Sequence, residues 1–164
     1  MSNPGDKGAA DRATRQARTA AARLYAVQAL FQMEAAGTSA DRVQTEFLNW
    51  RIGRMDEDDD VVSAEADDAL FRRIVDDAVA WQARIDQMTD RALVAKWPID
   101  RIDPVLRSVF RAAGAELVTP KTPPKVVIAE YVRLAQAFFA EGRESKFVNA
   151  VLDHMAREAR PDAF

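Results

Sequence analysis

The sequence contains no cysteine and a single histidine, His154. Without thiols the chain has no disulfide framework, no zinc–thiolate site and no thiol nucleophile. One imidazole does not make a multi-nitrogen metal site, and the aspartates lack the spacing and turn glycine of a calcium-binding loop. Ser145 and His154 should lie about 13 Å apart along one helix, too far to act as nucleophile and base. The sequence therefore favours a non-enzymatic protein without metal or cofactor.

Two further absences limit the location and ligands of the protein. No apolar run approaches the roughly 20 residues that span a bilayer, and the first residues lack the apolar core of a secretory signal. No glycine-rich loop precedes a helix, which argues against a nucleotide-binding site. Together with the lack of cysteine, these features predict a cytoplasmic protein that does not enter the membrane.

The apolar residues that are present follow a helical period throughout. They make up 48% of the 164 residues, enough for one compact domain or two small subdomains that share a core. No segment alternates as a half-buried strand would. The fold class predicted is all-α, a compact bundle of about seven helices in two subdomains. The expected helices cover residues 13–35, 41–50, 69–81, 84–97, 103–117, 127–138 and 145–155.

The domain organisation follows from composition. Residues 1–11 are rich in Gly, Pro and polar side chains and are expected to be a disordered leader. Residues 12–82 should form an N-terminal three-helix subdomain that includes an acidic loop at 56–68. Residues 83–164 should form the C-terminal helical subdomain, in which Asp100 or Asp103 caps a helix that begins at Pro104.

Charge is distributed unevenly along the chain. Residues 1–24 carry five cations against two acids, a net charge of +3, and residues 56–77 carry ten acids against two arginines, a net charge of −8. On a helix, Arg12, Arg15 and Arg23 fall within about an 80° sector and Arg18 lies about 60° beyond it, a stripe that could follow phosphates. A merely solubilising helix end is the alternative. The acidic residues 56–60 are interpreted as a solvated loop, although a cation or a basic protein could bind them.

The segment ESKFVNAVLDHMA, residues 144–156, combines three features of single-strand recognition. A helix N-terminus offers free N–H groups to a phosphate, Lys146 adds a full charge, and Phe147 could stack on an unpaired base. Asn149 adds a hydrogen-bonding group. The alternative is that Phe147 fills the core and Asn149 bonds a neighbouring turn.

Four segments together resemble the NusB family of bacterial transcription antitermination factors: ARLYAVQALFQME (22–34), LRSVFRAAGAEL (106–117), PPKVVIAEYVRLAQAFF (123–139) and ESKFVNAVLDHMA (144–156). The resemblance runs from about residue 12 to residue 157, and FVNAVLD is its most specific motif. It implies an all-helical, non-enzymatic protein that pairs with NusE, a small-subunit ribosomal protein. The pair would bind the boxA element of ribosomal RNA transcripts and help RNA polymerase read through terminators.

The resemblance also implies a set of binding residues. Arg23 is the close match to the family's basic first helix, whereas Thr19 to Ala22 replaces part of its arginine cluster and leaves the other arginines displaced upstream. Asp103 is expected to face the basic NusE partner. A helical scaffold or homodimer that does not bind RNA stays open as the alternative. The RNA-binding residues predicted are Arg15, Arg18, Arg23, Phe31, Lys146, Phe147 and Asn149.

Overall fold

The structure is a computed structural model that describes residues 4–51, 66–93, 102–139 and 143–164. Within these ranges it contains seven α-helices and no strand, so the predicted all-α bundle is confirmed. The elements are α1 (Pro4–Ala36), α2 (Ala40–Glu46), the π-helical turn η1 (Phe47–Arg51), α3 (Asp68–Ala80), α4 (Gln82–Ala92), α5 (Pro104–Val118), α6 (Pro124–Phe138), α7 (Arg143–Ala159) and the 3-10 turn η3 (Pro161–Ala163).

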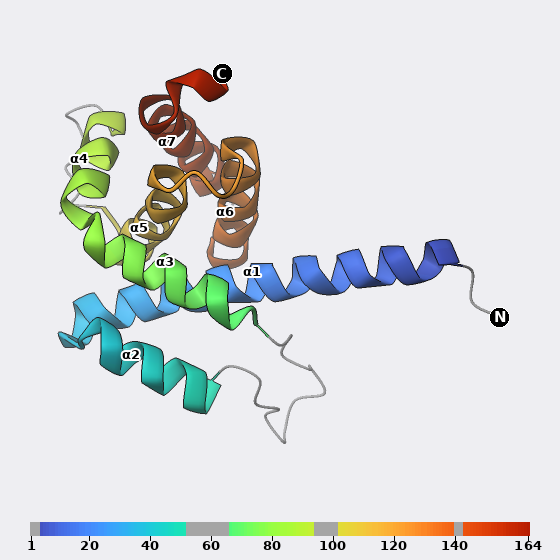
Figure 1. Ribbon diagram of the computed structural model, residues 1–164. Coiled ribbons are helices and arrows are strands. Elements are labelled where there is room, and N and C mark those ends of the chain that lie inside the picture. Colours follow the sequence, from blue (N-terminus) through green and yellow to red (C-terminus); the bar gives the residue numbers. More distant parts are fainter. Residues whose placement is uncertain (1–3, 52–65, 94–101, 140–142) are drawn as a thin grey trace.

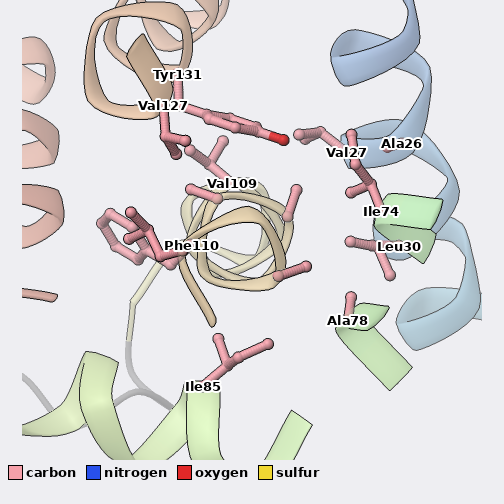
Figure 2. Close-up of a cluster of buried hydrophobic side chains, with 14 of the residues drawn as sticks. Ala26, Val27, Leu30, Ile74, Ala78, Ile85, Val109, Phe110, Val127 and Tyr131 are labelled. Carbon is pink, nitrogen blue, oxygen red and sulfur yellow. The ribbon is translucent and has the colours of Figure 1, made fainter. Parts of the chain in front are cut away.

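Helix α5 forms the centre of the bundle. It packs against α1, α3, α4, α6 and α7, and side chains from four of these helices converge on it in Figure 2. Its run of small buried residues, Ala112 to Ala115, allows its neighbours to approach closely on several sides. The approach is closest at Gly114, where an added Cβ would lie 2.4 Å from Cγ2 of Ile85 on α4. A helix buried all round needs this composition because large side chains on every face would hold the layers apart.

Local sequence signals determine where the helices begin and end. Asp103 accepts a hydrogen bond from the backbone N–H of Val105 at 2.8 Å, and Pro104 occupies the first turn of α5, as predicted. Asp67 caps α3 in the same way through the N–H of Leu70. Gly37 adopts a φ of 67°, the left-handed conformation that ends α1.

Arg160 connects the C-terminal end of α7 to the end of α5. Its guanidinium donates hydrogen bonds to the backbone carbonyls of Glu116, Leu117, Thr119 and Thr122. The last carbonyls of a helix have no partner within the helix and carry partial negative charge. One arginine therefore caps α5 and fixes the turn that leads into α6.

Two expectations about chain segments are corrected. Residues 1–11 were expected to be a disordered leader, but α1 begins at Pro4, since Pro suits a first helical turn and the two early glycines are compatible with an exposed helix. Helix α7 begins at Arg143, two residues before its expected start at 145.

Three further expectations concern the acidic loop, the end of the fourth helix and the boundary between subdomains. The acidic residues 56–60 and the expected helix end at 94–97 lie outside the described residues. The described helices share one cluster of buried side chains. The division into subdomains at residue 82 therefore stays a prediction.

Candidate functional site

The N-terminal part of α1 projects beyond the bundle (Figure 1). Every residue from 4 to 18 is exposed, and contact with the bundle begins where the backbone N–H of Asp67 donates to the carbonyl of Arg18 at 3.1 Å. We call residues 4–18 the arm. Within the described part of the chain, none of its four cations takes part in an ion pair. These cations are Lys7, Arg12, Arg15 and Arg18.

Arg23 lies in the interior, which corrects the expectation that it faces RNA. Its side chain is 7% exposed, and its Nε and Nη2 atoms donate to the two carboxylate oxygens of Glu116 at 2.9 and 3.1 Å. Glu130 lies 3.9 Å from Nη1. Burial disfavours the charged form, but the hydrogen bond and charge of Glu116 outweigh it, so the pKa of Arg23 is raised. A guanidinium held in this way is not available to a phosphate.

The Arg23–Glu116 pair belongs to a wider polar cluster between α1, α5 and α6. Thr122 donates its hydroxyl to Glu116 at 3.3 Å. Tyr131 is fully buried beside the pair, and burial, followed by the charge of Glu116, raises the pKa of its phenol well above the ordinary value. The cluster links the start of the bundle-contacting part of α1 to the α5–α6 turn.

Phe31 lies in a shallow apolar groove of about 420 Å³ between α1, α5 and α6. Val27 and Ala35 of α1, Val105 of α5 and Phe138 of α6 line the groove with it. The two rings are 38% and 39% exposed. Asp103 is exposed and lies two residues before Val105, so a carboxylate lies close in sequence to the groove.

The predicted residues of α7 lie at its N-terminal end. Lys146 and Asn149 are exposed and, three residues apart, share one side of the helix. Phe147 is half-buried, with its ring edge-on to Phe110 of α5 at a centroid distance of 6.2 Å. Part of the Phe147 ring therefore contributes to the core and part is exposed, about 100° from Lys146 and about 160° from Asn149 around the helix. The core alternative for Phe147 is therefore partly realised, and the stacking of its ring on a base stays a prediction.

The predicted residues form two groups and not one patch. Helix α1 packs on α2, α3, α5 and α6, whereas α7 packs on α4, α5, α6 and η3. Around α1, Phe31 lies about 140° from Arg18 and about 160° from Arg15 at 100° per residue. Phe31 borders α5 at Val105, and Phe147 of α7 borders the same helix at Phe110. The cations of the arm lie on another side of α1 than Phe31.

Three residues of the candidate site were not predicted from the sequence. Glu116 looked like one more polar position on an apolar helix, and only its contact with a residue 93 positions away reveals its role. Tyr131 and Phe138 share the spacing of a buried face on α6, yet Tyr131 is buried and Phe138 is exposed. Two consecutive aromatic residues at the end of α6, Phe138 and Phe139, were the available signal, because both cannot face the core.

The described residues contain no group of three or more His, Cys, Asp or Glu side chains that could hold a metal ion. None of the described helices is long and apolar enough to cross a membrane.

Comparison with known proteins identifies the class of protein to which this chain belongs. The model of the NusB family matches residues 20–157. The transcription antitermination protein NusB of Maricaulis maris (strain MCS10) is 46% identical over 145 residues, which cover 88% of this chain and 89% of that protein. Among solved structures, T. maritima NusB has a TM-score of 0.67 at 29% identity and covers 87% of this chain and 94% of its own.

A second solved structure contains antitermination factors NusB and NusE in complex with dsRNA. One of its chains has a TM-score of 0.66 at 24% identity and covers 85% of this chain and 96% of its own, a likeness of fold. Fold and relatives together define a class of all-helical transcription factors that are not enzymes. The chain belongs to the NusB family, as the sequence motifs predicted.

Proposed function

We propose that this chain binds the boxA element of ribosomal RNA transcripts together with NusE, in the bacterial cytoplasm, and helps RNA polymerase read through terminators. Membership of the family supports the antitermination role. The observation that carries the RNA-binding role is the N-terminal end of α7, where a half-buried aromatic ring, an exposed lysine and an exposed asparagine lie within about one turn of the helix. We call Lys146, Phe147 and Asn149 the α7 corner.

The chemistry of the α7 corner suits an unpaired RNA strand. The N-terminal end of a helix carries partial positive charge that favours a phosphate, and the ammonium of Lys146 adds to this attraction. The exposed part of the Phe147 ring can stack on a base, an interaction that contributes about 1 to 3 kcal/mol. Packing against Phe110 fixes the ring before RNA arrives, so little side-chain entropy is lost on binding.

The groove around Phe31 suits the protein partner better than RNA. Its lining is mostly aliphatic and aromatic, and partly exposed rings at such a surface are typical anchors for another protein. We therefore propose that Phe31, predicted as an RNA contact, serves NusE together with Phe138. Asp103 supplies negative charge nearby that would attract a basic partner.

Titration of a fluorescent boxA oligonucleotide tests the proposal. The chain alone should bind weakly and the complex with NusE tightly, because NusE contributes part of the RNA surface. Equal affinity with and without NusE would contradict the shared surface. In the complex, Phe147→Ala should weaken binding by about 1 to 3 kcal/mol, and Phe164→Ala, which removes another partly exposed ring, should not.

Asp103→Asn isolates the charge contribution to NusE binding. Asparagine keeps a capping oxygen for α5 and removes the carboxylate charge. We expect slower association with NusE and a smaller dependence of that rate on salt, measured by stopped-flow mixing. An unchanged rate would exclude Asp103 from the partner surface.

The apolar groove also favours the alternative of a scaffold or homodimer that binds only proteins. RNA binding that depends on cations weakens steeply with salt, whereas a protein-only scaffold ignores a short RNA at every salt concentration. The same titration, repeated over a range of salt, separates the two functions.

A further inference from the structure

Three buried polar side-chain atoms in the described part of the chain have no hydrogen-bond partner: Nε of Arg107, the phenol oxygen of Tyr131 and Oε2 of Glu144. Arg107 still pairs with Glu34 through another nitrogen at 2.7 Å, and Tyr131 belongs to the polar cluster between α1, α5 and α6. Glu144 differs, because its side chain makes no ion pair and no hydrogen bond within the described ranges. A buried acceptor without a donor destabilises a fold, and a ligand that supplies the donor removes that cost.

Glu144 lies one helical turn before Phe147, on the same side of α7, and both side chains are partly exposed. The two residues are about 60° apart around the helix, with Cβ atoms about 5 to 6 Å apart at this spacing. Side chains on a helix lean toward its N-terminus, so the Phe147 ring leans toward the Glu144 carboxylate. Lys146 and Asn149 lie about 160° and about 140° from Glu144, on the other side of the helix. The α7 corner therefore has one side suited to a base and another suited to a phosphate.

A base that stacks on the exposed part of the Phe147 ring would present its edge to this carboxylate. Proteins read unpaired RNA bases along the Watson–Crick edge, among others. Guanine offers two neighbouring donors there, N1–H and the N2 amino group, which match the two oxygens of a carboxylate. Adenine and cytosine offer one amino group beside a ring nitrogen that accepts, and uracil offers N3–H between two carbonyls. A carboxylate repels these lone pairs, so guanine is the base that suits Glu144.

We propose that Glu144 is a specificity-determining residue of the α7 corner, whose carboxylate accepts hydrogen bonds from N1–H and the N2 amino group of a guanine stacked on Phe147. This inference rests on the proposed function and adds a base preference to it. The last torsion of a glutamate is broad, so a rotation turns the buried Oε2 toward the base. The guanine then supplies the donor that this oxygen lacks in the free chain.

Fluorescence titration of the complex of the full chain with NusE measures this preference. The probes are oligouridines of about nine nucleotides that carry guanosine, inosine, adenosine or a further uridine near the centre. The guanosine strand should bind about tenfold more tightly than the adenosine strand, which has the same two rings and controls for stacking. Inosine lacks the N2 amino group, so its strand should bind about threefold more weakly than the guanosine strand.

Glu144→Gln keeps the size of the side chain and removes its charge and one acceptor oxygen. This variant should bind the guanosine and adenosine strands equally, and the uridine strand at least as tightly as wild type does. The control Asp153→Asn removes another partly exposed carboxylate from α7, one that pairs with Arg157, and should keep the guanosine preference. Phe147→Ala should lose the preference together with affinity for every strand, since no base stacks at that position.

Three results would overturn the inference alone: no guanosine preference in wild type, a preference that survives in Glu144→Gln, or an equal loss of affinity of this variant for all four strands. If the preference survives and Glu144→Gln binds NusE more weakly, the carboxylate serves the protein partner and not the RNA. Failure of the wild-type complex to bind a boxA oligonucleotide would overturn the proposed function and, with it, this inference.

Discussion

The two parts of α1 use the same type of side chain in opposite ways. In the part that packs on the bundle, Arg23 is buried and bonded to both carboxylate oxygens of Glu116. In the arm, Arg15 and Arg18 are exposed and make no ion pair among the described residues. A stripe of arginines read from the sequence therefore contains two kinds of residue, one that stabilises the fold and one that is available to a ligand.

The comparison leads to a general expectation for mutations. Changes in the bundle should alter the free energy of unfolding, since its side chains belong to one core cluster. Changes in the arm should leave that free energy almost unchanged, because the side chains of the arm are exposed.

The largest effect is expected from Glu116→Ala. This change leaves the Arg23 charge buried without its main partner, and removing one partner of a buried ion pair typically costs about 3 to 5 kcal/mol. Urea unfolding measures the loss. R15A is the control in the arm and should stay within about 0.5 kcal/mol of wild type. A small effect of Glu116→Ala would mean that water reaches Arg23 and that its interior position has been overestimated.

Gly114→Ala should have the next largest effect. The added methyl group would lie 2.4 Å from Cγ2 of Ile85, so α4 and α5 must separate or the isoleucine must change rotamer. Such overpacking typically costs about 1 to 3 kcal/mol, more than the gain in helix propensity from glycine to alanine. The double variant Gly114→Ala/Ile85→Ala tests the cause, since removing Cγ1 and Cγ2 of residue 85 should make Gly114→Ala cost less than it does beside isoleucine. Thermal unfolding of the two single variants and of the double variant would show whether it does.

Two arginines near the end of α7 should differ by a smaller amount in their effect on the free energy of unfolding. Arg160 donates to four backbone carbonyls at the end of α5, whereas Arg157 is exposed, pairs with Asp153 and lies over the ring of Phe164. Arg160→Ala leaves partly buried carbonyls without a donor, at a cost of about 1 to 3 kcal/mol. Arg157→Ala removes exposed interactions that contribute at most about 1 kcal/mol. Equal urea midpoints for the two variants would contradict the capping role of Arg160.

Much of the fold could be predicted from the sequence because its signals are local. Helical spacing predicted a helix over residues 145–155, which lies within α7, and Asp103 with Pro104 marked the start of α5. Both depend on residues a few positions apart, which a helix brings together by itself.

The candidate site was less predictable because it depends on distant residues. The roles of Arg23 and Phe31 are decided by Glu116, Phe138 and Val105, which the chain brings to them only when it folds. Composition also misled at residues 4–11, where Gly5 and Gly8 suggested disorder but continue a helix. Exposure and partners, and not residue type, distinguish a binding arginine from a structural one.

The smallest effect on global stability is expected from Gly8→Ala. Gly8 lies in the arm, an added Cβ would meet no atom within 4 Å, and alanine favours an exposed helix by about 1 kcal/mol over glycine. The helicity of the arm should therefore rise, which hydrogen exchange of the amides at 5–15 would report as slower exchange. The urea midpoint of the bundle should stay unchanged, since the arm can fray while the core cluster remains intact. A midpoint that rises together with arm protection would show that arm and bundle unfold as one unit.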